Sequence, residues 1–290
     1  MNKIYDGKHF LSDSIYRAAD GLANSDALMI ENNPSDYIWS KKAPRDNRKA
    51  TTMDIGTALH AAILEPEKYK DSIVVSSVKG RETKKFKEEQ DLNGGKIVLT
   101  DDERIHIDFM CKSVFAHPSA ADMLAIKGDC ESSIFVKDKQ TGVYLKCRPD
   151  KDMVESGGVV LDVKTTASLD DWRSDKPWIN PLYKFNYGHQ ASFYTDVMQQ
   201  HYGCDIETFV FLVIQKNIKL GRYPVGVFQI TKDELIDLGF WGEHRANIDK
   251  FKQCCNENDW SHAESFNFAQ KDDESFSNDD IVVEFEEDNK

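Results

Sequence analysis

Apolar residues in the first third of the chain recur at the three- and four-residue spacing of an amphipathic helix. A helix is expected over residues 27–31, with Ser25 or Asp26 as its N-cap, because either side chain can accept a hydrogen bond from the first free backbone N–H groups. A second helix is expected over residues 35–41, started by Pro34, which suits a first helical turn. The chain is therefore predicted to begin with helices.

Two further helices have clear N-terminal signals. Thr52 is expected to cap a helix that stops at Pro66. Thr100, followed three residues later by Glu103, is typical of a capping box, and its helix is expected to run toward Pro118. Both helices precede the part of the chain in which the pattern changes.

After residue 130 the apolar residues alternate with a period of two, in short runs separated by turn residues at 140–142 and 155–158. The first three runs are read as a three-strand meander. The whole order of helices and strands predicts an α/β or α+β domain built on one mixed sheet. Strands are expected at 133–137, 143–148, 159–163, 208–215 and 225–230, and helices at 184–202 and 232–253.

The composition excludes a membrane protein and a disulfide-stabilised secreted protein. The chain has 290 residues, of which 40% are hydrophobic and 30% charged, enough for one large core. Its longest apolar runs fall well short of the roughly 18 residues that a membrane span needs. The first residues of the printed sequence contain no apolar stretch of the length expected for a signal peptide, and the six cysteines show neither a disulfide framework nor metal-knuckle spacing. A cytoplasmic protein is expected.

The net charge of −13 argues at first against a nucleic-acid partner, because binding phosphates requires a basic surface. The charge is unevenly spread, however. Residues 271–290 contain nine acidic and two basic residues, a net charge of −7, and the other 270 residues carry 35 − 41 = −6. We expect a single domain over residues 1–270 and an acidic disordered tail over 271–290.

Three residues at two strand ends suggest a chemical function. Asp162 and Lys164 lie two apart on one strand and so share a face, and an antiparallel hairpin through Gly157-Gly158 would bring Asp150 toward them. Carboxylate oxygens suit Mg²⁺ or Mn²⁺, which can lower the pKa of a bound water, while the lysine orients or deprotonates that water. The expected reaction is phosphodiester hydrolysis, although Asp and Lys at strand ends are more often solvated turn residues.

Four motifs in order make the pattern more specific: Gly56-Thr-Ala-Leu-His60, Arg148-Pro-Asp150, Leu161-Asp-Val-Lys164 and Gln190-Ala-Ser-Phe-Tyr194. Together they resemble the PD-(D/E)xK nuclease superfamily. The closer likeness within it is to the RecB-like branch and to RecE-type exonucleases, the C-terminal nuclease domain of exonuclease VIII. The resemblance covers residues 56–194 and implies a restriction-endonuclease-like core with an N-terminal helical extension.

The resemblance implies a role for each motif residue. His60, Asp150 and Asp162 would be metal ligands, and Lys164 would be the catalytic lysine. Glu131 matches an acidic catalytic position of some relatives. Gln190, Tyr194 and Thr165 would contact the substrate, at the scissile phosphate or a flanking base. From the residues alone, His60 is more simply a core histidine, Glu131 a surface carboxylate, and Gln190 and Tyr194 packing residues.

The same resemblance implies the cofactors and partners. Mg²⁺ is the expected cofactor, with Mn²⁺ as a substitute. No iron–sulfur cluster is expected, since the first cysteine is Cys111, and no ATP, since the chain has no P-loop motif. The expected substrate is the end of double-stranded DNA, contacted by the basic residues of the charged segment 79–87 and by Lys146, Arg148 and Lys164.

The expected function is therefore exonuclease action in DNA recombination, in a bacterial or phage-infected cell. By resemblance, such an enzyme degrades linear duplex from 5′ to 3′, leaves 3′ single strands for an annealing protein, and assembles into a ring-shaped homo-oligomer. Two alternatives stay open. One is a single-strand or structure-specific nuclease of the same superfamily, and the other is a catalytically silent DNA-binding scaffold of the same fold.

Overall fold

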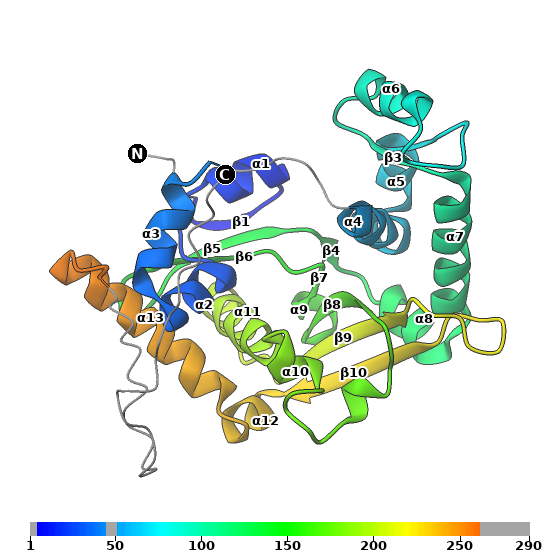
Figure 1. Ribbon diagram of the computed structural model, residues 1–290. Helices are drawn as coiled ribbons and strands as arrows, with labels where there is room; N and C mark the ends of the chain where they lie inside the picture. Colours follow the sequence, from blue (N-terminus) through cyan, green and yellow to red (C-terminus); the bar gives the residue numbers. More distant parts are fainter. Residues whose placement is uncertain (1–4, 45–50, 262–290) are drawn as a thin grey trace, which may run out of the picture.

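A five-stranded mixed sheet lies at the centre of the protein, in the order β10-β9-β8-β7-β4 (Figure 1). Strands β8 and β9 run parallel, and the other neighbours are antiparallel. The computed structural model describes residues 5–44 and 51–261, so the predicted acidic tail at 271–290 lies outside the described residues. The sheet consists of β4 (Asp129–Cys130), β7 (Lys151–Met153), β8 (Val159–Thr166), β9 (Thr208–Gln215) and β10 (Val225–Thr231).

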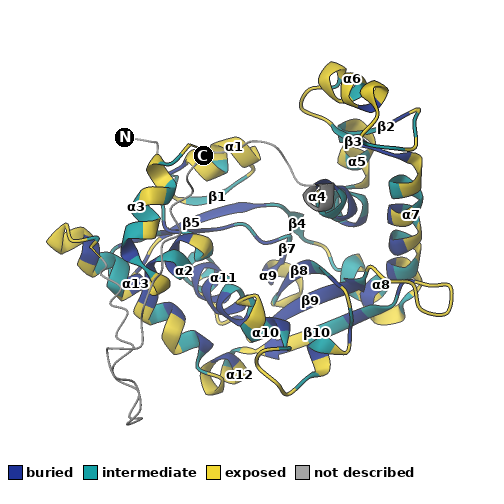
Figure 2. Cartoon of the chain, in the orientation of Figure 1, coloured by how far each residue is buried: buried dark blue, intermediate teal, exposed yellow. Residues whose placement is uncertain are grey.

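Alternation along β9 divides the core between the two faces of this sheet. Phe209, Phe211 and Val213 face one side, where they pack with α11 (Tyr187–Tyr202) and α13 (Phe240–Glu257). The residues between them face the other side and pack with α4 (Thr51–Leu64), α7 (Asp101–Ala116) and α8 (Pro118–Ala125). Figure 2 shows β8 and β9 as largely buried. The predicted mixed α/β class is confirmed.

The predicted three-strand meander is wrong, because its strands belong to two sheets. Strand β5 (Ser133–Lys137) pairs with β6 (Tyr144–Cys147) and with β1 (Gly7–His9) in a separate three-stranded sheet. The chain then leaves β6 and forms β7, a strand too short to show a period of two, which pairs with β8. A third sheet joins β2 (Ile73–Val75) and β3 (Ile97–Leu99) in parallel.

Helix boundaries follow the capping signals in most places. The Thr100–Glu103 capping box is confirmed: Glu103 N–H donates to Thr100 Oγ1 at 3.3 Å, and Thr100 N–H donates to the Glu103 carboxylate at 2.9 Å. The helix predicted over 27–31 begins earlier, at Asn24, and Asp26 in its first turn accepts a hydrogen bond from Ala23 N–H at 3.2 Å. The long C-terminal helix is interrupted at Gly239, whose φ of +89° favours glycine.

The remaining helices are short. Pro66 and Pro118 each begin a helix, where only a stop was predicted. None of the described helices combines the length and the apolar character needed to cross a membrane. The bounds are α1 (Asp13–Ala18), α2 (Asn24–Asn32), α3 (Pro34–Lys42), α5 (Pro66–Ser72), α6 (Lys84–Leu92), α9 (Val154–Gly157), the 3-10 helix η1 (Asp171–Arg173), α10 (Pro181–Lys184) and α12 (Lys232–Asp237).

Candidate active site

The β7–β8 hairpin brings Asp150 to Asp162, as the sequence predicts. The two strands are antiparallel, with Lys151 opposite Leu161, and the single turn of α9 that joins them ends at Gly158 in the left-handed conformation. Asp150 immediately precedes β7, and its carboxylate accepts a hydrogen bond from Val163 N–H at 2.6 Å. Asp150 is thus fixed against the backbone of β8, one residue beyond Asp162.

Asp162 and Lys164 point to the same face of β8, toward α11. The Lys164 Nζ atom lies 2.6 Å from Asp162 Oδ2, and Gln190 on α11 donates from Nε2 to Asp162 Oδ1 at 2.6 Å. The side chain of Asp162 is 2% exposed. Burial raises the pKa of Asp162 to about 6, and the nearby Asp150 also raises it, whereas Lys164 opposes the shift. Through this hydrogen bond, Gln190 helps to position the Asp162 carboxylate.

His60, Glu131 and Asp150 form the histidine–carboxylate cluster. One potential ligand atom from each residue lies within 4.8 Å of the others, and His60 Nδ1 is 3.3 Å from Asp150 Oδ2. Burial alone would lower the pKa of His60, but the Asp150 carboxylate outweighs it and raises the pKa to about 9. The imidazole proton thus offsets carboxylate charge, which is what a bound cation would also do. The donor set fits a divalent metal ion.

Glu131 is held in this cluster by an unusual backbone conformation. Its φ of +54° is left-handed, which costs a non-glycine residue about 1–2 kcal/mol. Arg148 Nε lies 2.9 Å from the Glu131 carboxylate and donates to the Glu131 carbonyl at 3.1 Å. Asp162, predicted as a metal ligand, is not one of the three cluster residues identified within the described part of the chain.

Two residues predicted to contact the substrate, Tyr194 and Thr165, make no hydrogen bond to these carboxylates in the described part of the chain. Tyr194 is half-buried on α11, with its ring 6.4 Å from that of Phe209, and burial raises its pKa well above the ordinary value. Thr165 lies opposite Ile214 of β9, and alternation places its side chain on the other face of β8 from Lys164. The structure therefore brings Gln190 to the carboxylates but does not show a contact of Tyr194 or Thr165 with them.

The predicted basic lining for DNA needs correction at Lys146. Its side chain is buried, and Nζ donates to the carbonyls of Ala19 at 2.6 Å and Tyr16 at 3.1 Å, so this ammonium joins α1 to β6 instead of facing a ligand. Arg81 is likewise engaged, with ion pairs to Glu103 at 2.8 Å and Asp54 at 3.1 Å. Neither cation is placed to contact a phosphate.

The sequence reasoning missed Tyr187. Lys164 Nζ lies 4.7 Å from the centre of the Tyr187 ring, within reach of a cation–π interaction. Burial alone would lower the pKa of Lys164, but Asp162 outweighs it and raises the pKa, so the ammonium stays charged. Tyr187 precedes Gln190 by three residues, a helical spacing that places both on one face of α11 and would have identified it.

One comparison with a known structure agrees with this architecture. A candidate exonuclease from Eubacterium rectale matches with a TM-score of 0.56 and 14% identity, over 91% of this chain and 99% of that protein. At this identity the likeness shows the fold alone. An alkaline exonuclease from Laribacter hongkongensis matches with a TM-score of 0.28 and 12% identity, over 70% of this chain and 97% of that protein. A comparison with curated proteins finds no match.

A family model decides the relationship. It covers residues 31–270, which include the histidine–carboxylate cluster, Asp162, Lys164 and every strand of the five-stranded sheet. The chain belongs to the family described as the PDDEXK-like domain of unknown function, DUF3799.

Proposed function

We propose that the protein is a Mg²⁺-dependent DNA exonuclease. The observation that carries this proposal is that two polar groups meet along β8: the Asp162–Lys164 ion pair at 2.6 Å and the His60–Asp150 contact at 3.3 Å. Val163 N–H, which donates to Asp150, joins the two. A charged donor beside a potential cation site is the arrangement that phosphodiester hydrolysis requires.

Each of these residues has a specific task in the proposed reaction. His60, Glu131 and Asp150 would hold the cation, with Asp162 as a further ligand, and the cation when bound would lower the pKa of water and offset phosphate charge. Lys164 is charged, so it acts as a donor that orients the attacking water and stabilises the charge that develops on the phosphate oxygens. Gln190 keeps Asp162 in place through its hydrogen bond.

The finer features of the proposal rest on the resemblance to RecE-type exonucleases. We propose that the enzyme degrades linear duplex from the 5′ end and leaves a 3′ single strand for an annealing protein. A ring-shaped homo-oligomer would keep DNA enclosed without ATP. The fold match to the Eubacterium rectale protein, itself described as a candidate exonuclease, supports the activity class but not the polarity.

Digestion of linear duplex with Mg²⁺, with one strand labelled either at its 5′ end or at its 3′ end, tests both the activity and its polarity. We expect the 5′ label to be released first. Lys164→Ala should lose at least about a hundredfold in rate, because removing one transition-state donor costs about that much. Lys139→Ala, at an exposed position on the β5–β6 turn, is the matched control. Absence of digestion, or full activity in Lys164→Ala, would exclude the proposal, and rapid loss of a closed circle would indicate an endonuclease.

A further inference from the structure

An exposed aromatic side chain stands beside the candidate active site, at the corner between α10 and α11. Phe185 is 54% exposed, and it lies in the two-residue connection that separates the helices. Lys184 precedes it at an exposed position, with Nζ 5.3 Å from the centre of the Phe185 ring. More than half of the residue's surface is therefore open to a ligand at a position next to a basic side chain.

Two neighbouring aromatic rings, with a lysine on either side of the pair, connect this corner to the reaction centre. Lys164 Nζ lies 4.7 Å from the Tyr187 ring, and the Tyr187 ring lies 5.7 Å from that of Phe185. Tyr187 is itself stacked on Trp172, at 5.7 Å and an interplanar angle of 25°. Phe185 is thus one ring away from Lys164 and extends the site toward solvent.

The backbone holds this corner in one conformation. Phe185 N–H donates to the Pro181 carbonyl at 3.1 Å, and Asn186, with φ of +57°, reverses the chain into α11. A side chain at Gly188 would lie only 2.4 Å from the Phe240 ring, so α11 is packed directly on α13 at this point. Phe185 is therefore an exposed ring on a fixed support, which loses little entropy on binding.

We propose that Phe185 and Lys184 form a stacking subsite for an unpaired nucleobase of the DNA end, next to the phosphate at Lys164. This inference rests on the proposed function. Aromatic rings beside basic groups bind single-stranded nucleic acid in this way, because every base has a flat face and every linkage a negative charge. An internal base of a duplex has both faces covered by its neighbours and a paired terminal base has one face covered, whereas an unpaired terminal nucleotide can turn out of the stack. The substrate would therefore be a DNA end with its terminal nucleotide unpaired.

The affinities for two duplexes, measured by fluorescence anisotropy with Ca²⁺ in place of Mg²⁺, test the subsite. One duplex has a non-complementary terminal nucleotide, and the other has its terminal pair cross-linked so that it cannot open. We expect the protein to bind the open end at least about tenfold more tightly, the effect of one stacked base. Phe185→Ala and Phe185→Leu should abolish that preference, and Phe185→Trp should keep it.

Phe109→Ala is the matched control, because Phe109 on α7 is 51% exposed and has Lys112 Nζ at 5.1 Å from its ring centre. An unchanged preference in Phe185→Ala, an equal loss in Phe109→Ala, or no preference in the unmodified protein would overturn the subsite. Digestion of fully paired linear duplex is measured separately. If the protein digests this duplex and Phe185→Ala keeps the preference for the open end, only the subsite is refuted. If the protein does not digest the duplex, the proposed function is refuted.

Discussion

At the scale of single residues, the candidate site depends on how buried charges compensate one another. Asp150 accepts from a backbone N–H and faces His60, and Asp162 faces Lys164 and Gln190. Each carboxylate therefore has a partner, which is the condition under which a charge can be buried. The two pairs are joined through one peptide unit of β8, so a change at either pair affects the other.

The histidine–carboxylate cluster predicts where a cation binds. Asp150→Asn should remove Mn²⁺ binding, and Glu131→Gln should weaken it at least about tenfold, because each substitution replaces a charged ligand by a neutral amide. Isothermal titration with Mn²⁺ measures both affinities. Glu155→Gln, an exposed carboxylate on α9, is the control and should bind normally. If Asp150→Asn bound Mn²⁺ as tightly as the unmodified protein, the cluster would not be the metal site.

Spacing along the chain was enough to place Asp150, Asp162 and Lys164 near one another, because a hairpin and a period of two are local rules. Such local rules did not predict how Glu131 reaches the site. Its side chain reaches the cluster through a left-handed backbone that Arg148 holds, and neither the strain nor the partner has a sequence signature. Which carboxylates surround His60 therefore became clear only from the structure.

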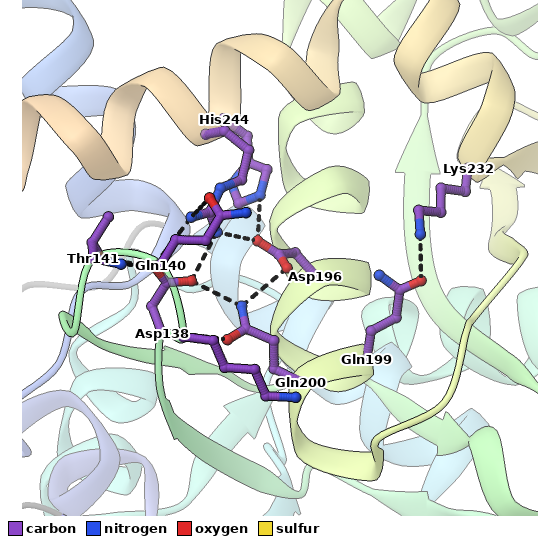
Figure 3. A network of polar contacts seen from close by, with 10 residues as sticks. Asp138, Gln140, Thr141, Asp196, Gln199, Gln200, Lys232 and His244 are labelled. Carbon is purple, nitrogen blue, oxygen red and sulfur yellow. Dashed lines mark hydrogen bonds and ion pairs between the residues drawn. The ribbon is translucent and has the colours of Figure 1, made fainter.

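At the scale of elements, a buried polar network joins the β5–β6 turn to α11 and α13 (Figure 3). Arg245 on α13 contacts Asp138 at 2.9 Å and Asp196 at 2.6 Å, and Gln200 donates to both carboxylates. His244 Nε2 lies 2.9 Å from Asp196. The network connects the three-stranded sheet to the helices α11 and α13, which cover one face of the five-stranded sheet.

Removing one charge from this network should destabilise the protein. Burial alone would raise the pKa of Asp138, but Arg245 and its other donors hold that pKa well below its ordinary value. Asp138→Asn leaves Arg245 with only one carboxylate partner, at a cost of about 2 kcal/mol of unfolding free energy, less than for a fully orphaned buried charge because Asp196 remains. Thermal unfolding at pH 7 measures the difference, and Asp170→Asn, at an exposed position, should change little.

The pH dependence of this effect follows from its sign. The carboxyl group of Asp138 has a lower pKa in the folded protein than in the unfolded chain, so its stabilising contribution is present above pH ~4 and declines as the pH falls further. The difference between Asp138→Asn and the unmodified protein should shrink from pH 5 to pH 2.5. A difference that stays constant over this range would mean that the carboxylate charge is not what stabilises the network.

The corner that carries Phe185 depends on a glycine. Gly188→Ala would place a Cβ atom 2.4 Å from the Phe240 ring, and the overpacking should cost about 1–3 kcal/mol of unfolding free energy. Gly242→Ala is the control, since nothing lies within 4 Å of its added Cβ. Chemical denaturation monitored by circular dichroism compares the two. Equal stability of both variants would show that α11 and α13 can separate at no cost.

Elements with a local signal were predictable, and elements without one were not. The Thr100–Glu103 box and the strand at 208–215 agree with the structure because side chains within a few residues determine them. The β7 strand has three residues, and its partner is selected by the sheet it joins. This is why the predicted meander was wrong, although all three of its strands exist.

At the scale of the whole molecule, the negative charge restricts where DNA can bind. Lys146 and Arg81 are engaged inside the protein, so the basic surface for phosphates must come from other residues. Lys184 and Lys164, on the two sides of the Tyr187–Phe185 pair, are placed to supply part of it. A short basic track at the site would give modest, salt-dependent affinity, because few counterions are released.

The twenty C-terminal residues should be dispensable for folding and for digestion. The hydrophobic cores and every candidate site residue lie before residue 262, whereas residues 271–290 carry a net charge of −7. We expect a chain ending at residue 270 to keep its melting temperature and its rate on linear duplex at 150 mM salt, where charges are screened beyond about 8 Å. A full-length chain with residues 271–290 in scrambled order controls for charge. If truncation instead raised the rate at low salt and the scrambled chain did not, these residues would compete with DNA for the site through their negative charge and not through the order of their residues. If both altered chains melted earlier, the domain would extend beyond residue 270.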